Sequence, residues 1–131
     1  MRGALRSAGL PADDLNDAVL AYRLDDAVGV VGWAALEICD LEALLRSVVV
    51  VPERRGTGGG SDLVRQMIAA ASETGVQRLW LLTETAAPFF ERLGFQTVDR
   101  GAAPEPIQST SEFRECCPRS AACMTLALPQ P

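Results

Sequence analysis

Residues 48–63 read VVVVPERRGTGGGSDL, and this stretch decides the fold. The four valines are apolar on both faces of a strand, which is typical of a strand in the middle of a sheet. Pro52 cannot donate to a ladder and ends the strand. A glycine-rich turn follows, and the next residues predict a helix over 60–74 that ends at Gly75. Its apolar residues recur at helical spacing: Leu63, Val64, Met67, Ile68 and Ala71.

A strand, a glycine-rich turn and a helix together make a phosphate-binding site on physical grounds. The N–H groups of a first helical turn lack partners within the helix, and the helix dipole adds partial positive charge there. The glycines in residues 56–60 let the backbone approach an anion closely. Arg54 and Arg55 add positive charge, and one of them is expected to form bidentate contacts with phosphate. The sequence therefore predicts an anion site at the start of the helix.

Other glycine motifs fit this turn less well. A dinucleotide-binding G-x-G-x-x-G pattern that begins at Gly56 meets Ser61 where the third glycine belongs, and a P-loop requires a lysine. A flexible surface loop is the remaining alternative. The valine strand before the turn and the amphipathic helix after it argue against that alternative.

The rest of the chain alternates strand and helix patterns around this stretch. Thr85 is a candidate N-cap for a helix over 86–93, residues 5–9 are typical of the end of a short helix, and residues 101–111 predict a loop. The fold class is therefore mixed α/β (α+β), with a parallel pair of strands on either side of helix 60–74. The expected strands are residues 19–24, 28–38, 44–51, 78–83, 95–98 and 123–128.

The composition fits one globular domain over residues 1–131, with 48% hydrophobic and 22% charged residues. The longest apolar run, residues 48–51, is far shorter than the ~20 residues that span a bilayer. Acidic residues from Asp13 onward interrupt the N-terminal segment before a signal peptide could form. We therefore expect a cytoplasmic protein with no membrane partner. The net charge of −5 argues against a nucleic-acid partner, because duplex binding requires a broad basic field.

The residue types that are absent from the chain limit the catalytic and metal-binding chemistry it could perform. All 12 basic residues are arginine, and the chain has no lysine and no histidine. Histidine bases, histidine metal ligands and lysine Schiff bases are therefore excluded, and any chemistry must use carboxylates, hydroxyls, thiols, arginine or backbone amides. The four cysteines form no C-x-x-C pair, so we expect no metal site.

Two stretches resemble one family. Residues 50–63 resemble the acetyl-CoA motif of the GNAT acetyltransferases, in which R/Q-x-x-G-x-G/A follows V-x-P. Residues 87–95, APFFERLGF, resemble the family's later helix–strand motif, which often reads F-Y-x-x-x-G-F. The two matches lie at the usual separation, and the resemblance covers roughly residues 19–128.

The resemblance implies a fold and a reaction. GNAT domains have a mixed, mostly antiparallel central sheet with flanking helices and a splayed parallel strand pair. They transfer an acetyl group directly from acetyl-CoA to an amine, while backbone N–H groups of the splayed strand bind the pantetheine and polarise the thioester. In this chain the N–H of Val50 is the expected oxyanion donor. The implied contacts with acetyl-CoA are Val49, Val50, Val51, Arg55, Gly56, Thr57, Gly58, Gly59, Gly60, Ser61 and Phe90.

Charged and hydroxyl residues supply the candidates on the acceptor side. Glu37 is the first candidate for the base that deprotonates the amine, followed by Asp40 and Glu42; a solvated carboxylate with no catalytic role is the alternative for Glu37. Arg46 lies on an otherwise apolar strand, where an arginine is costly unless it faces a cleft or an anion. We expect Arg46, with Glu37 and Thr83, to bind the substrate, and an ion pair between Arg46 and Glu37 is the alternative.

The expected acceptor is a small amine, either an amino acid or an amine-bearing arsenical. The arsenical comes from a narrower resemblance: residues 44–47 (LLRS), 82–87 (LTETAA) and 117–124 (CPRSAACM) are similar to the GNAT branch found in arsenic-resistance operons. Cys117 and Cys123 suggest a further alternative from a different class, a protein that binds trivalent arsenicals through its thiols.

The sequence departs from the family pattern at two places. Phe90 stands where many members carry a tyrosine that protonates the departing thiolate. A thiol pKa of about 8.5 makes the thiolate a tolerable leaving group, so water or the Thr83 hydroxyl could substitute; the alternative is a non-catalytic acyl-CoA sensor or partner-binding domain. Residues 1–10 offer no convincing strand, so the family's first strand is expected to be missing. The exposed sheet edge that would remain favours a homodimer.

Overall fold

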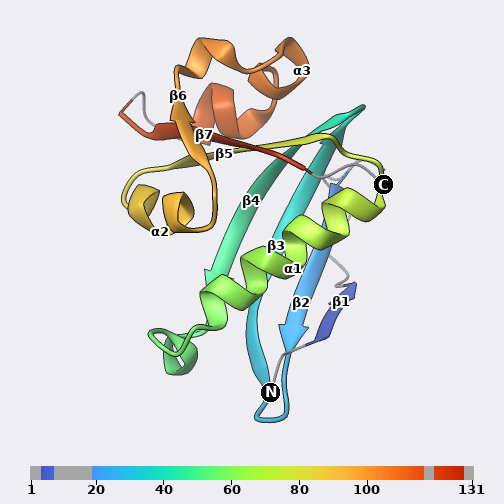
Figure 1. The fold of residues 1–131 in the computed structure, drawn as a ribbon, viewed down its shortest axis with the longest axis vertical. Helices are drawn as coiled ribbons and strands as arrows, with labels where there is room; N and C mark the ends of the chain where they lie inside the picture. Colours follow the sequence, from blue (N-terminus) through green and yellow to red (C-terminus); the bar gives the residue numbers. More distant parts are fainter. Residues whose placement is uncertain (1–3, 8–18, 117–119, 129–131) are drawn as a thin grey trace.

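A computed structural model describes residues 4–7, 19–116 and 120–128 of the chain (Figure 1). Within these residues the strands form a seven-stranded sheet in the order β1-β2-β3-β4-β5-β7-β6. All neighbouring strands are antiparallel except β4 and β5, which confirms the expected mixed sheet and its parallel pair. The strands are β1 (Ala4–Ser7), β2 (Val19–Asp25), β3 (Val30–Cys39), β4 (Glu42–Val50), β5 (Arg78–Thr83), β6 (Gln96–Val98) and β7 (Ala122–Ala127).

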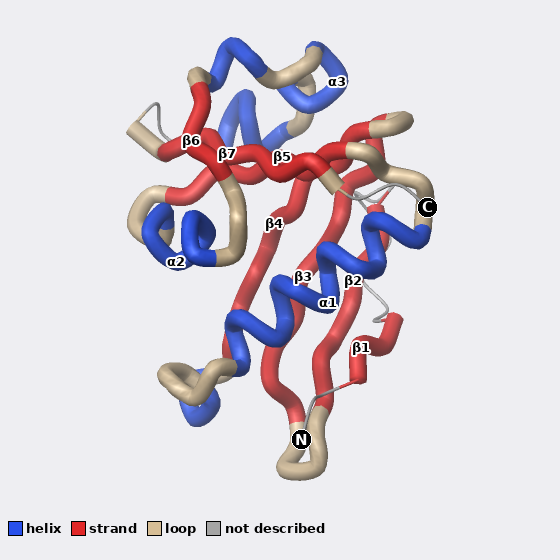
Figure 2. The backbone as a smooth tube through the Cα atoms, in the orientation of Figure 1, coloured by secondary structure: helices blue, strands red, loops and turns tan. Residues whose placement is uncertain are grey.

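One long helix, α1 (Gly59–Glu73), lies diagonally across β2, β3 and β4 (Figure 2). Most of the shorter helical segments gather around β5, β6 and β7, whereas the 3-10 turn η2 (Pro52–Arg54) lies between β4 and α1. The others are the helices α2 (Ala87–Arg92) and α3 (Glu105–Gln108), the 3-10 turn η3 (Arg100–Ala102), and the π-helical turn η4 (Glu112–Cys116). Among the described residues, no helix is both long and apolar enough to cross a bilayer.

Successive side chains of the central strands pack alternately in two hydrophobic cores, one on each face of the sheet. Leu45 packs in the core beneath α1, where Leu63, Val64, Met67 and Ala71 of α1 are buried and Ile68 is partly buried. The residue before Leu45 is Leu44, which packs in the opposite core with Trp80, Ile107 and Phe113. This alternation follows from the two-residue period of a strand, and it fixes which side chains of β4 face away from α1.

Strands β4 and β5 are paired over only three residue pairs, from Glu42 with Arg78 to Leu44 with Trp80. Beyond this ladder β4 continues to Val50 and β5 continues to Thr83 without pairing to one another. A bulge in β4, where Ser47 has a φ of 58°, bends the strand at this point. The two strands therefore diverge, and the gap between them opens toward the turn that leads into α1.

Four expectations about local structure are wrong. Residues 4–7 form a strand, β1, that pairs with β2, so residues 5–7 are not the end of a helix and the first strand is not missing. Thr85 does not cap α2: the N-cap is Ala86, whose N–H donates to the Thr83 hydroxyl at 3.0 Å. Residues 101–111 carry a helix, α3, because Pro104 and Pro106 occupy its start, where proline is tolerated.

Candidate functional site

The turn after β4 leads directly into the first turn of α1. The N–H of Val51 donates to the carbonyl of Val31 in β3 at 2.9 Å, which fixes the start of the turn. Gly58 is the N-cap of α1 and has a φ of 86°, a region that glycine adopts without strain. The N–H of Asp62 donates to the Gly58 carbonyl at 3.1 Å. The amides of the residues between them precede the helical ladder and face the turn.

The backbone of Val50 faces the gap between the diverging strands. The carbonyl oxygen of Val49 lies against Gly32 of β3, and the N–H of Val51 also bonds to β3. Because successive residues of a strand direct their N–H and C=O groups to opposite edges, the N–H and C=O of Val50 face away from β3. Nε of Arg55 donates to the Val50 carbonyl at 3.2 Å, which agrees with this orientation.

A groove of about 610 Å³ runs along this edge of β4 and over the start of α1; we refer to it as the turn groove. Its floor is backbone and glycine, and its one charged side chain in the described residues is Arg55. A Cβ on Gly60 would lie 3.5 Å from both the Phe89 ring and the Val50 side chain, so the glycine leaves the groove open at its narrowest wall. The lining residues are Val48, Val49, Val50, Arg55, Gly56, Gly58, Gly60, Ser61 and Phe89.

A second cavity of about 330 Å³ lies between β4 and β5; we refer to it as the strand pocket. It shares Val48 and Phe89 with the turn groove, so the two spaces adjoin at these side chains. Its walls are mostly apolar, with one arginine, one glutamate and two hydroxyl residues among them. The lining residues are Leu45, Arg46, Ser47, Val48, Leu81, Leu82, Thr83, Ala86, Phe89, Phe90 and Glu112.

Arg46 of the strand pocket is paired with two carboxylates. Its Nη1 donates to Oε1 of Glu37 at 2.8 Å, and its Nε lies 3.7 Å from Oε2 of Glu112. The side chains are partly buried, with exposed fractions of 29% for Arg46 and 16% for Glu37. The ion pair with Glu37 that the sequence left as an alternative is therefore present. Glu112 comes from η4, far away in the sequence, and sequence reasoning missed it.

The two phenylalanines of α2 occupy different places. Phe90 is 7% exposed and meets Phe89 and Phe95 edge to face, with ring centroids 5.0 and 5.5 Å apart. It therefore lies in the core and reaches the strand pocket, while Phe89 lines both the pocket and the turn groove. The sequence placed Phe90 against acetyl-CoA and missed Phe89. No local pattern in the sequence distinguishes Phe89 from Phe90, because the contact of Phe89 with Gly60 joins two separate helices.

The other polar candidates lie away from this region. Asp40 and Glu42 lie at the β3–β4 turn, at the opposite end of β4, and Glu42 accepts a hydrogen bond from Nε1 of Trp80 at 2.6 Å. Cys123 is 3% exposed, and burial raises the pKa of its thiol, which disfavours the thiolate that binds metalloids. Cys117 lies outside the described residues.

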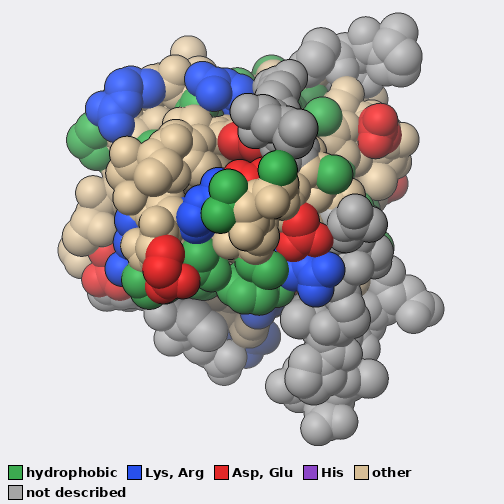
Figure 3. All heavy atoms as spheres, turned by 90° about the horizontal axis from the view of Figure 1, so that it is seen from below, with side chains coloured by type: hydrophobic (Ala, Val, Ile, Leu, Met, Phe, Trp, Pro, Cys, Tyr) green, Lys and Arg blue, Asp and Glu red, His purple; other side chains and the backbone are tan. Residues whose placement is uncertain are grey.

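Charges around the turn are mixed, without a single dominant sign. Seen from the end of the molecule that carries the β2–β3 hairpin and the turn, arginine side chains alternate with aspartate and glutamate side chains (Figure 3). In the described part of the chain, no three Cys, Asp or Glu side chains gather closely enough to hold a metal ion. The turn groove and the strand pocket together therefore offer backbone donors, two arginines, serine and threonine hydroxyls and the two carboxylates paired with Arg46.

Comparison with known proteins assigns the fold to a family. A family model described as an acetyltransferase (GNAT) domain matches residues 16–97. The chain belongs to the GNAT acetyltransferase family. An "uncharacterized N-acetyltransferase" of Chlorobaculum tepidum is 32% identical over 102 residues, which is 76% of this chain and 62% of that protein. The chain thus spans less than two thirds of this relative's length.

Solved structures show the same GNAT fold. N-acetylglutamate synthase of Neisseria gonorrhoeae, in complex with coenzyme A and N-acetyl-glutamate, superposes with a TM-score of 0.72 at 23% identity, covering 84% of this chain and 26% of that one. An acetyltransferase of Bacillus subtilis in complex with CoA gives a TM-score of 0.72 at 13% identity, covering 98% of this chain and 100% of that one. At these identities the likeness is one of fold.

The turn groove of this GNAT domain fits coenzyme A by the chemistry of its walls. A diphosphate requires N–H donors and positive charge, which the start of α1 and Arg55 supply. A pantetheine arm carries amides that require backbone partners, and the gap-facing edge of β4 offers them at Val50.

Proposed function

We propose that this GNAT domain is an acetyl-CoA-dependent N-acetyltransferase that acts on a small amine by direct transfer. One observation carries the proposal: the Val50 amide faces a gap between two diverging strands, directly beside a glycine turn that begins a helix. A thioester placed along β4 would have its carbonyl at this amide and its diphosphate at the helix start. The adjoining strand pocket would then receive the amine.

In the proposed reaction a neutral amine attacks the thioester carbonyl carbon. The N–C bond forms, the C–S bond breaks, and CoA leaves as a thiolate. The substrate ammonium loses one proton before attack, and the nitrogen loses a second as the tetrahedral intermediate collapses; one of these protons can neutralise the thiolate. The N–H of Val50 donates to the oxyanion as its negative charge develops. A fixed dipole aimed at this developing charge stabilises the transition state more than the ground state.

Two carboxylates can accept the first proton. Glu37 is the base expected from the sequence, and Glu112 is a second candidate because it lines the strand pocket directly. The Thr83 hydroxyl accepts an N–H from Ala86, and its own O–H can donate a hydrogen bond that stabilises the departing thiolate until a proton from the amine neutralises it. This supports Thr83 as the substitute for the tyrosine that Phe90 replaces.

The acceptor is a small amine such as an amino acid or an amine-bearing arsenical. The size of the strand pocket, about 330 Å³, supports a small substrate. Arg46 could still contact a carboxylate or an arsonic group, because a guanidinium has five N–H donors and only part of this set meets Glu37 and Glu112. A cytoplasmic location and a homodimer stay predictions from the sequence, and the edge of β2 from which the homodimer was argued is covered by β1.

The test is a screen for release of free CoA, followed with a thiol reagent, against amino acids, aminoalkyl arsenicals and polyamines. Release that depends on one of these amines, with the acetylated product identified by mass spectrometry, supports the proposal. Tight binding of acetyl-CoA without release for any amine would contradict it and favour an acyl-CoA sensor instead.

Substituting Glu37→Gln is expected to lower kcat at neutral pH by at least about tenfold and to leave acetyl-CoA binding unchanged. Glutamine keeps the shape and can still accept from Arg46, but it cannot take a proton. The deficit should shrink as pH rises above the pKa of the amine, because the neutral amine then needs no base. Steady-state kinetics over a pH series measures this.

The matched variant for this experiment is Glu112→Gln, which changes the other carboxylate beside Arg46. A pH-dependent loss of kcat in Glu112→Gln, together with wild-type turnover in Glu37→Gln, would identify Glu112 and not Glu37 as the base. Wild-type turnover in both variants would exclude a carboxylate base at this arginine.

A further inference from the structure

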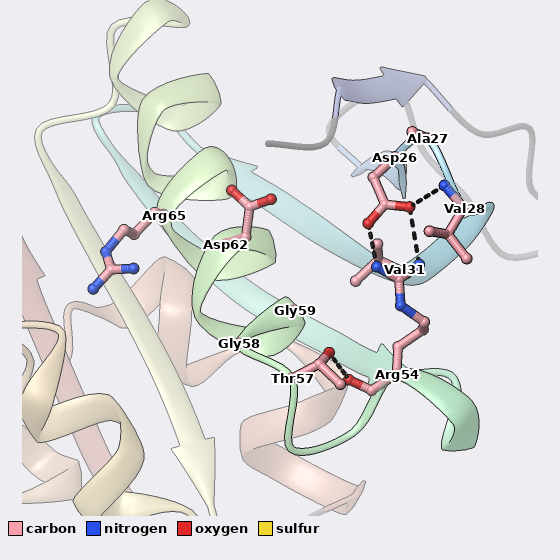
Figure 4. A pocket seen from close by; sticks show the side chains of 10 residues that line it. All are labelled: Asp26, Ala27, Val28, Val31, Arg54, Thr57, Gly58, Gly59, Asp62 and Arg65. Atoms are coloured by element: carbon pink, nitrogen blue, oxygen red, sulfur yellow. Dashed lines mark hydrogen bonds and ion pairs between the residues drawn. The ribbon is translucent and has the colours of Figure 1, made fainter. Parts of the chain in front are cut away.

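The two neighbouring arginines of the glycine turn face different environments. Arg55 is exposed and lines the turn groove, whereas Arg54 points to the other side of the turn and reaches the β2–β3 hairpin (Figure 4). Nη1 of Arg54 donates to Oδ1 of Asp26 at 3.0 Å, and its Nη2 pairs with the second carboxylate oxygen. The pair is bidentate, and both side chains are largely shielded, with exposed fractions of 18% and 12%.

The carboxylate of Asp26 is itself fixed by the hairpin. Its Oδ1 accepts the N–H of Val28 at 2.9 Å and the N–H of Gly29 at 3.2 Å. Hydrogen bonds from Arg54 and from these backbone amides hold the pKa of Asp26 well below its usual range. The carboxylate therefore stays ionised at any pH at which acetyl transfer would be measured, and the pair stays charged.

Arg54 in turn fixes the glycine turn. Its carbonyl accepts the Thr57 hydroxyl at 2.5 Å, in the middle of the turn (Figure 4). Within the described residues, the hairpin, Arg54 and Thr57 thus form one continuous chain of hydrogen bonds that ends beside Gly58, the N-cap of α1. The glycines on either side of Thr57 supply no side-chain contacts of their own, so this chain is what restrains the turn from the outer side.

We propose that the Asp26–Arg54 pair is a positioning pair, which fixes the glycine turn in the conformation that binds the diphosphate of acetyl-CoA. The inference rests on the proposed function. In it, Arg54 supports binding by holding the turn in place and does not contact the phosphate. A turn fixed in advance does not have to be ordered on binding, so less of the interaction free energy is lost. The pair should therefore act on the affinity for acetyl-CoA and not on the chemical step.

The competing role for Arg54 is direct contact with phosphate after release from Asp26. The two roles predict opposite effects of one substitution, Asp26→Asn, on the affinity for acetyl-CoA. If the pair positions the turn, Asp26→Asn weakens acetyl-CoA binding, because Arg54 loses its anchor. If Asp26 sequesters a phosphate ligand, Asp26→Asn tightens binding, because Arg54 is set free.

The experiment measures the Kd of acetyl-CoA by calorimetry, in the absence of amine, for Asp26→Asn, Arg54→Gln and the double variant. We expect each single variant to raise Kd by about three- to tenfold and the double variant to raise it no further, because both remove the same interaction. Arg54→Lys keeps the charge and loses the planar guanidinium, so its Kd should lie between those of the wild type and Arg54→Gln. At saturating acetyl-CoA, kcat should stay within about twofold of wild type.

The matched control is Asp25→Asn, which breaks the neighbouring ion pair with Arg23 on β2, at 3.0 Å, outside the turn. It should leave Kd unchanged, and thermal unfolding of every variant checks that the fold persists. A tighter Kd in Asp26→Asn, an unchanged Kd in both single variants, or an equal effect in Asp25→Asn would overturn the inference alone. Failure of the wild-type protein to bind acetyl-CoA would instead overturn the proposed function.

Discussion

Replacing Val50 with proline is expected to lower kcat for acetyl transfer by about a hundredfold or more, the usual result of removing one oxyanion donor. Proline lacks the N–H that faces the gap, and the N–H of Val50 forms no bond to β3, so the sheet loses no ladder bond. The effect should appear in kcat and should exceed any change in the Kd of CoA. Steady-state kinetics with a responsive amine, together with calorimetry of CoA, measures the two separately.

The matched control is Val50→Ala, which trims the side chain beside Gly60 and keeps the N–H. It should retain kcat within a few-fold of wild type. Equal losses of kcat in the alanine and proline variants would show that the side chain, and not the amide, supports the reaction. A proline variant with wild-type kcat would remove Val50 from the mechanism.

The variant Gly32→Ala is expected to have the largest effect on stability. A Cβ at this position would overlap the carbonyl oxygen of Val49 and lie 3.1 Å from its carbonyl carbon. Both atoms are backbone, so β3 and β4 must separate to make room. Overpacking of this kind costs about 3 kcal/mol of the free energy of unfolding, or roughly 10 °C in Tm.

Thermal and urea unfolding measure this loss, and Gly101→Ala is the matched control because a Cβ at Gly101 would meet nothing within 4 Å. Because the strain falls on Val49, the displacement should reach the Val50 amide and reduce acetyl transfer as well. Wild-type stability in Gly32→Ala would mean that β3 and β4 do not approach as closely as the structure has them.

Local patterns in the sequence were sufficient to predict α1 and the strands at the centre of the sheet. Residues 78–83 form β5 as expected, and α1 begins and ends within one residue of the expected range. Both segments carry a strong period and clear end signals, such as Gly75 with its φ of 90°. Their structure depends mostly on their own residues, which is why the sequence predicts it.

The features that were missed depend on partners distant in the sequence. The strand β1 exists because β2 offers an edge, and η4 brings Glu112 to Arg46 across 66 residues of chain, the difference between positions 112 and 46. The Asp26–Arg54 pair joins residues 28 apart. The family motif assigned only Arg55 to acetyl-CoA, and the partner of Arg54 became visible only in the structure.

The short ladder between β4 and β5 also has a mechanical consequence. It leaves the molecule as two half-sheets, β1 to β4 and β5 to β7, that are hydrogen-bonded to one another over three residue pairs near one end. In the described residues, backbone hydrogen bonds between β4 and β5 join the halves only at that end, and the opposite end is held by side-chain packing. A pantetheine arm lying between the strands would brace the open end, so this GNAT domain should become stiffer when it is loaded.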